Sequence, residues 1–232
     1  MAPGATTASS LSGCTVCSAG KWSIEGTSGA CSLDCGAGYW CINGIKSLCL
    51  GGKYSTVLTA STINTCLSCP EGTLSTLTGS SSLDSCLFCN DGYWSLSGSS
   101  TICSEKCGAG YFCSKGSKKS CPAGTYSLDT TAALISTCIA CDAGKYSTNT
   151  AASLSTTCVN CADGLWSISG SDSCVDDCGS GYYCSKGLKT ACSAGKYSSA
   201  TKASSLISCN TCPTGSFCSA GSSSPTPCSA GR

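Results

Sequence analysis

The chain has 232 residues, with 26 Cys, no His, 11 % charged residues and a net charge of +1. This cysteine density is typical of a disulfide scaffold from an oxidising compartment, and the balanced charge leaves no basic surface to neutralise nucleic acid. The longest aliphatic run, Ala132 to Ile135, is too short for the ~20 apolar residues of a membrane span. We therefore expect an extracellular or cell-surface protein that has no nucleic-acid partner and no membrane span in this segment.

The two ends of the chain are predicted to differ from its middle. Residues 1–13 contain no cysteine and lack the basic and apolar regions of a secretory signal, so we interpret them as a linker or as part of a preceding unit. Residues 228–232 begin like the repeats described next and then stop. We interpret them as the start of a further, truncated unit, and the chain as an excerpt of a longer repetitive polypeptide.

Between these ends the chain consists of short modules, each opened by a cysteine. The opening cysteine is always followed three residues later by Gly, and five residues later by an aromatic residue in every module but one, which has Leu74. A glycine at a fixed offset predicts a tight turn with a positive φ, and the aromatic ring is then placed to cover a pair of sulfur atoms. The twelve opening cysteines are Cys17, Cys35, Cys49, Cys69, Cys89, Cys107, Cys121, Cys141, Cys161, Cys178, Cys192 and Cys212.

A longer repeat is superimposed on the modules. The sixth residue after the opening cysteine runs Ser, Cys, Ser, Ser and then repeats, and Cys14, Cys86 and Cys158 are spaced by one such block. We therefore divide the chain into cysteine-rich blocks at residues 14–85, 86–157 and 158–227, the last with an irregular end.

The predicted fold is a tandem array of small disulfide-rich modules, forming an extended rod of short irregular β-hairpins and loops with little helix. Tracts rich in Ser, Thr and Ala follow each aromatic residue, as in Ser147 to Thr157, and we interpret them as short strands or loops. Modules this small cannot offset the entropy of ordering the chain by burial alone. Covalent closure must contribute, at about 3 kcal/mol for a loop of ~15 residues.

The spacing favours disulfides that join each opening cysteine to the next cysteine in the sequence. Eight cysteines in a block still permit 105 pairings, so other connectivities remain open. The favoured register leaves Cys14 and Cys228 without partners. It pairs Cys17 with Cys31, Cys35 with Cys41, Cys49 with Cys66, Cys69 with Cys86, Cys89 with Cys103, Cys107 with Cys113, Cys121 with Cys138, Cys141 with Cys158, Cys161 with Cys174, Cys178 with Cys184, Cys192 with Cys209, and Cys212 with Cys218.

One string resembles a known module type. Cys-Pro-Ala-Gly-Thr-Tyr-Ser at Cys121 to Ser127, closed by Cys-Ile-Ala-Cys at Cys138 to Cys141, resembles the ephrin-receptor-like cysteine-rich repeat and the first half of a tumour-necrosis-factor-receptor module. The Cys-Gly-Ala-Gly-Tyr-Phe-Cys form at Cys107 to Cys113 is similar to its companion in large extracellular proteins of protists and algae. The resemblance implies a module, and no ligand-binding residue, because such repeats serve as stalks, adhesins and receptors.

Catalytic, metal and cofactor sites are not expected. The absence of His removes the usual base for a serine nucleophile, so we expect no enzyme and no catalytic residues. The alternative of zinc rests on Cys-x-x-Cys pairs such as Cys66/Cys69 followed by Cys86/Cys89, which fall within zinc-site spacing. Adjoining modules would have to share these cysteines between two sites, so disulfides are favoured and no cofactor is predicted.

The sequence favours a structural role, with the chain forming or supporting a fibre, filament or stalk. Its partners would be further copies of itself, or the continuation of the same repetitive chain, together with covalent glycans. The alternative is a ligand-binding surface ectodomain or adhesin. O-linked glycans are expected because the chain contains 47 Ser and 25 Thr. The candidate sites are Thr59, Thr62, Thr65, Thr76, Thr78, Thr148, Thr150, Thr156 and Thr157.

Overall fold

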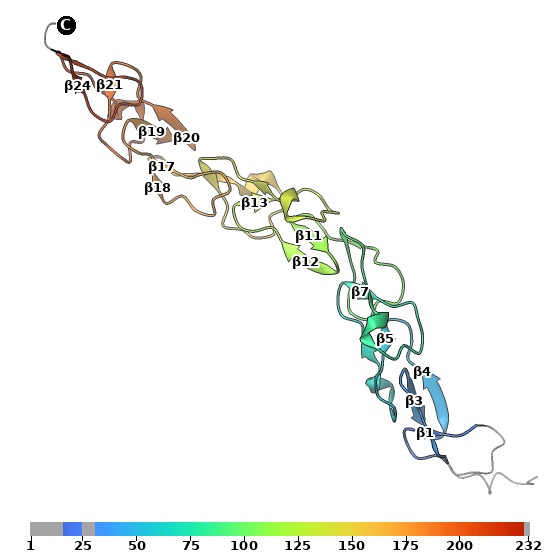
Figure 1. Ribbon diagram of the computed structural model, residues 1–232. Helices are drawn as coiled ribbons and strands as arrows, with labels where there is room; N and C mark the ends of the chain where they lie inside the picture. The colour runs from blue at the N-terminus through green and yellow to red at the C-terminus, as the bar shows by residue number, and fades with distance from the viewer. Residues whose placement is uncertain (1–15, 25–30, 230–232) are drawn as a thin grey trace, which may run out of the picture. The chain divides into compact units, whose positions relative to one another are not determined.

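The computed structural model describes residues 16–24 and 31–229 (Figure 1). The predictions for residues 1–13, for Cys14 and for the last three residues of the truncated unit lie outside the described residues. The chain divides into two compact parts. One comprises the described residues up to Glu105 together with Ser114–Ser117, and the other comprises Lys106–Cys113 together with the described residues from Lys118 onward.

Short paired strands make up the regular structure. In the described residues each strand pairs with one other, giving twelve two-stranded sheets. The first twelve strands are β1 (Lys21–Trp22), β2 (Leu33–Asp34), β3 (Tyr39–Ile42), β4 (Ile45–Leu48), β5 (Lys53–Tyr54), β6 (Leu67–Ser68), β7 (Thr73–Leu74), β8 (Leu87–Phe88), β9 (Tyr93–Trp94), β10 (Glu105–Lys106), β11 (Tyr111–Ser114) and β12 (Ser117–Ser120). The others are β13 (Thr125–Tyr126), β14 (Ile139–Ala140), β15 (Lys145–Tyr146), β16 (Val159–Asn160), β17 (Leu165–Trp166), β18 (Asp176–Asp177), β19 (Tyr182–Ser185), β20 (Leu188–Ala191), β21 (Lys196–Tyr197), β22 (Asn210–Thr211), β23 (Ser216–Phe217) and β24 (Thr226–Pro227).

The helical content is limited to single 3₁₀ turns just before a closing cysteine. A hydroxyl one residue before that cysteine fixes several of them, as where Thr65 Oγ1 donates to the carbonyl of Thr62 at 2.7 Å. The prediction of tandem disulfide-rich modules with short hairpins and little helix is confirmed. The turns are η2 (Ile63–Thr65), η3 (Leu83–Ser85), η4 (Ile135–Thr137), η5 (Ser155–Thr157) and η6 (Leu206–Ser208), and no helix of the described residues has the length and apolarity that a membrane span needs.

The glycine after each opening cysteine lies in the turn that the sequence predicts. At Cys69, for example, the amide of Thr73 donates to the carbonyl of Pro70 at 3.2 Å, and Gly72 has φ +74°. This hydrogen bond spans four residues with glycine third, as in a type II turn, where the third residue must have a positive φ. All twelve of these glycines have φ between +74° and +86°. The prediction of a positive φ is therefore confirmed.

Three hairpins are longer than the rest, and Figure 1 shows β3 beside β4 and β19 beside β20. Their two-residue tips have positive φ at both positions, as at Asn43 (+50°) and Gly44 (+79°), which is the geometry that matches the twist of paired strands. In the other two tips a lysine occupies the first position, and an aspartate from the preceding module accepts its backbone N–H. Asp91 Oδ1 binds the amide of Lys115 at 3.0 Å, and Asp163 Oδ1 binds that of Lys186 at 2.8 Å.

The interior is made of sulfur and small side chains. Among the described residues, the buried hydrophobic side chains are all Cys or Ala, and the buried polar ones are Ser and Thr73. The aromatic residues predicted to cover the sulfur pairs are half-buried, except Phe217, which is 56 % exposed. No aliphatic core exists in this part of the chain that could hold a module together without its disulfides.

Candidate functional site: the junctions between modules

Disulfides close every module that the structure describes. The Cα atoms of the paired cysteines lie 5.3 to 6.0 Å apart, a separation typical of disulfides. The twelve pairs are those that the spacing favours, from Cys17–Cys31 to Cys212–Cys218. Cys228 is exposed and unpaired.

The Cys-x-x-Cys pairs that suggested zinc do not present free thiolates. Cys66 is bonded to Cys49, and Cys69 is bonded to Cys86. A zinc site at these positions would require the disulfides to be reduced, because the metal binds the thiolate form. Within residues 16–24 and 31–229, no three Cys, Asp or Glu side chains converge as a metal site requires.

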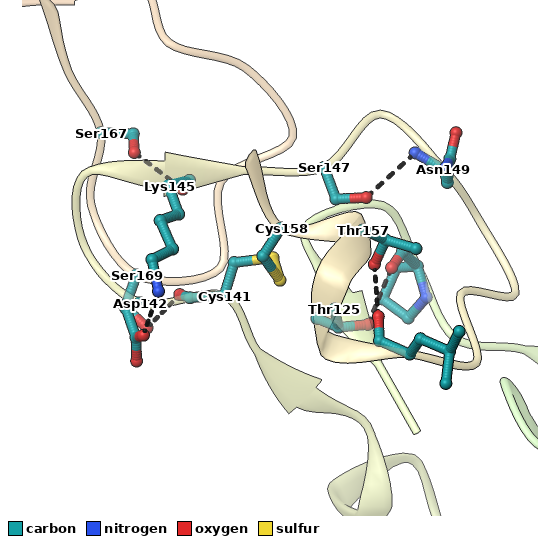
Figure 2. The surroundings of a disulfide bond; sticks show 12 residues. Thr125, Cys141, Asp142, Lys145, Ser147, Asn149, Thr157, Cys158, Ser167 and Ser169 are labelled. Atoms are coloured by element: carbon teal, nitrogen blue, oxygen red, sulfur yellow. Dashed lines mark hydrogen bonds and ion pairs between the residues drawn. A yellow bond between two sulfur atoms is a disulfide. The ribbon is translucent and has the colours of Figure 1, made fainter. Parts of the chain in front are cut away.

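Figure 2 shows how one disulfide, Cys141–Cys158, is embedded between modules. Ser169, from the following module, donates its hydroxyl to the carbonyl of Cys141 at 3.0 Å. Ser167 donates to the carbonyl of Lys145 at 2.9 Å. Side chains of one module thus bind the backbone of the module before it, next to the covalent closure.

The turn glycine forms the main contact between successive modules. Its N–H donates to the carbonyl of the sixth residue of the next module, for instance from Gly124 to Ser147 at 2.7 Å. Its carbonyl accepts the N–H of the next opening cysteine, here Cys141 at 2.8 Å. The N–H contact recurs with lengths of 2.7 to 3.0 Å, and its donors are Gly20, Gly38, Gly52, Gly72, Gly110, Gly124, Gly144, Gly164, Gly181 and Gly195.

The same glycine also lies against a module further along. A Cβ added to Gly124 would come within 2.1 Å of the carbonyl oxygen of Gly170, and one added to Gly52 would come within 2.1 Å of that of Gly98. Real Cβ atoms do not approach that closely, so the backbones can meet only because glycine has no side chain. At positions such as Gly52 and Gly124, the recurring glycine therefore serves both its own turn and the packing of modules that are two steps apart.

Serine at the sixth position is buried in every module that carries it except the first, where Ser23 is half-buried, and its hydroxyl finds a hydrogen-bond partner at some of these positions but not at others. Ser95 Oγ donates to the carbonyl of Thr73 in the preceding module at 2.9 Å. The hydroxyl of Ser75 is buried and has no hydrogen-bond partner among the described residues. An unpaired buried hydroxyl costs free energy, whereas a paired one contributes about 1 kcal/mol.

We therefore expect opposite results from two matched substitutions. Ser95→Ala is expected to lower the free energy of local opening by about 1 kcal/mol, because it removes a hydrogen bond between modules. Ser75→Ala is expected to leave it unchanged or to raise it. Hydrogen exchange of the Gly72 amide, which binds the carbonyl of Ser95 at 2.8 Å, reports this local opening in the oxidised protein. An equal loss of opening free energy in the two variants would contradict the conclusion that Ser95 forms a hydrogen bond and Ser75 does not.

Lysine side chains stack on aromatic rings once in each block. Lys46 Nζ lies 4.6 Å from the ring centroid of Trp22 and 4.0 Å from that of Tyr39, distances at which the ammonium is attracted to the ring faces. These rings belong to adjoining modules, so the lysine links them. The corresponding contacts are Lys118 with Tyr111, and Lys189 with Tyr182 and Trp166.

The predicted threonine sites fall into two groups. The hydroxyls of Thr65 and Thr157 are half-buried and donate to backbone carbonyls in the 3₁₀ turns, each at 2.7 Å. The exposed sites are Thr59, Thr62, Thr76, Thr78, Thr148, Thr150 and Thr156. The structure thus separates hydroxyls that are engaged in the fold from hydroxyls that are open to solvent.

Comparison with known proteins adds no relative. No protein-family model matches this chain, and a search of curated proteins finds no match. The structure identifies the chain as a tandem array of small cysteine-rich β-hairpin modules, held over the described residues by twelve disulfides and by a repeated backbone junction.

Proposed function

We propose that the chain is a non-enzymatic extracellular structural protein, which forms or supports a fibre, filament or stalk. The observation that carries this proposal is the repeated junction, in which ten turn glycines of the described residues bind the next module through both their N–H and their carbonyl. Modules that bind only modules near them in sequence make a quasi-one-dimensional array, which gives length without a globular core. An extended rod is the shape expected of such an array.

The composition of the exposed surface supports association between copies of the chain. The exposed side chains include Leu87, Ile102, Val175 and Ile207, all at least 65 % exposed, while only 11 % of the chain is charged. Apolar surface with so little charge favours contact with other protein surfaces. Lateral or end-to-end packing of copies would cover it.

Electron microscopy of native material provides the test, combined with small-angle scattering of the isolated oxidised chain. We expect fibres or stalks in the micrographs and the scattering profile of a rod. A compact particle in solution, with no fibre or stalk in native material, would contradict the proposal.

We infer that O-linked glycans hydrate part of this surface. The support is the cluster of exposed threonines at Thr76 and Thr78, and again at Thr148 and Thr150. Sugars are expected there and not at Thr65 or Thr157, because those hydroxyls already donate to the backbone.

Mass spectrometry of the native chain tests the glycans directly. We expect an intact mass above that of the oxidised polypeptide, with sugars mapped to peptides that carry the exposed threonines. A mass equal to that of the oxidised polypeptide without sugars would contradict the proposal of O-linked glycans. Sugars on Thr65 or Thr157 would contradict the role given to those hydroxyls.

A second candidate function is a ligand-binding ectodomain or adhesin, in keeping with the resemblance to ephrin-receptor-like and tumour-necrosis-factor-receptor modules. The observation in its favour is a hollow of about 410 Å³ beside Phe88, Tyr93 and Ile102. A monomeric rod that binds one partner saturably would favour this function over the fibre.

A further inference from the structure

The β7–β8 hairpin departs from the pattern that the other hairpins share. Phe88 occupies the residue just before an opening cysteine, where β6, β14, β16 and β22 have Ser68, Ala140, Asn160 and Thr211. It pairs with Thr73 across the hairpin, and 67 % of its surface is exposed. One edge of its ring lies against Gly116 of the β11–β12 tip, as the equivalent Asn160 lies against Gly187, but most of the ring remains open to solvent.

A hollow of about 430 Å³ lies beside Phe88. Its lining includes the apolar residues Leu83, Leu87 and Phe88 and the acidic residues Glu71 and Asp84. The sequence has four acidic residues and no basic residue from Tyr54 to Glu105, and neither Glu71 nor Asp84 forms an ion pair within the described residues. The hollow therefore suits an apolar side chain that is accompanied by a cation.

Among the long-hairpin tips that the structure describes, one presents that combination. The β19–β20 tip has Leu188, which is 71 % exposed, next to Lys186, whose ammonium forms no ion pair or ring contact within the described residues. The β3–β4 tip has an apolar residue, Ile45, but its lysine, Lys46, is stacked on aromatic rings. The β11–β12 tip has Lys115 but no apolar residue.

We propose that the hollow lined by Leu83, Leu87 and Phe88 receives two exposed side chains, Leu188 and Lys186, from the β19–β20 tip of a second copy of this chain. Leu188 fills the apolar part of the hollow, and the Lys186 ammonium pairs with the carboxylates of Glu71 and Asp84. The two surfaces are different, so the contact is heterologous and each copy can bind one neighbour on each side, which generates a chain of copies. This inference rests on the proposed filament function and names the contact through which copies join.

Charge reversal on either surface tests the contact in the full oxidised chain. Sedimentation velocity over a range of concentrations is expected to show self-association of the wild-type protein that weakens with added salt. Glu71→Lys/Asp84→Lys and Lys186→Glu are each expected to weaken it roughly tenfold or more, because like charges then face each other. Leu188→Ser is expected to weaken it as well, by removing the buried apolar group.

Mixing the two charge-reversed proteins provides the sharper measurement. The acidic tip of Lys186→Glu then faces the basic hollow of Glu71→Lys/Asp84→Lys. The wild-type tip of the second protein faces the wild-type hollow of the first. The mixture is therefore expected to regain the association that each variant lacks alone. A matched control is Ile45→Ser, which removes apolar surface from the β3–β4 tip. This control is expected to associate as the wild type does.

The outcomes separate this contact from the wider proposal. Wild-type protein that stays monomeric, variants that associate normally, or a mixture without recovery would each overturn the contact. If fibres still form in native material, the structural role stands and another surface joins the copies. If neither fibres nor self-association occur, the structural role fails too, and saturable binding of a different protein would point to the ectodomain function.

Discussion

Reduction of the disulfides is expected to abolish the fold completely, which is the largest effect that the structure predicts. A loop of sequence separation 17, as at Cys49–Cys66, is worth about 3 kcal/mol in the chain-entropy model, and a loop of separation 6, as at Cys35–Cys41, about 2 kcal/mol. Losing all twelve loops exceeds the 5–15 kcal/mol by which typical domains are stable. The interior cannot compensate, because its buried apolar side chains are Cys and Ala.

Near-ultraviolet circular dichroism of the Trp and Tyr side chains measures this loss during titration with a thiol reductant. Alkylation without reduction should leave the 24 paired cysteines unlabelled and should label Cys228. The control is the same protein reoxidised after removal of the reductant. A cooperative unfolding transition in the fully reduced chain, or stoichiometric zinc restoring the signal, would show that the disulfides are not what holds the modules.

The local architecture could be predicted from the sequence because it depends on short, fixed spacings. A glycine three residues after each opening cysteine permits the turn. The turn then brings two short strands within hydrogen-bonding distance of each other. Once the strands pair, the next cysteine in the sequence lies close to the opening one, as at Cys121 and Cys138. Turn, hairpin and disulfide are thus consequences of one local pattern.

The contacts between modules could not be predicted in the same way. The sequence shows that Gly124 recurs, but not that its missing Cβ makes room for the carbonyl of Gly170, 46 residues further along. The spacing of a repeat fixes the bonds within a module, whereas the rotation between modules depends on contacts that the spacing does not encode. The burial of Ser75 and Ser95 is a product of that rotation.

One local signal was present in the sequence and is informative in retrospect. Asn43-Gly44 is a dipeptide typical of two-residue hairpin tips, and it marks the longer β3–β4 hairpin. The lysine that stacks on rings is Lys46, three residues further on, whereas Lys21 and Lys145, which follow the turn glycine, pair with Asp34 and Asp142. The lysine that stacks on rings thus lies in the second strand of a long hairpin, and not directly after the turn glycine.

Gly124→Ala is expected to disrupt the packing of modules two steps apart, and Gly195→Ala is its matched control. The two glycines have nearly the same φ, +80° and +81°, and each donates to the sixth residue of the next module and accepts from the next opening cysteine. They differ in their surroundings. A Cβ at position 124 would lie 2.1 Å from the carbonyl oxygen of Gly170, whereas one at position 195 has no heavy atom within 4 Å.

The control measures the cost of placing alanine at a positive φ, which is about 1 kcal/mol. Gly124→Ala adds an overpacked contact with a backbone atom that cannot rotate away, for a total of about 4 kcal/mol. The disulfides stay closed in both variants, so the loss is local, and hydrogen exchange of the Gly170 amide, which donates to the carbonyl of Cys141 at 2.9 Å, is the measurement. Strongly faster exchange is expected in Gly124→Ala alone. Similar exchange in the two variants would mean that the recurring glycine is needed only for its turn, and that modules two steps apart contribute little to holding the array together.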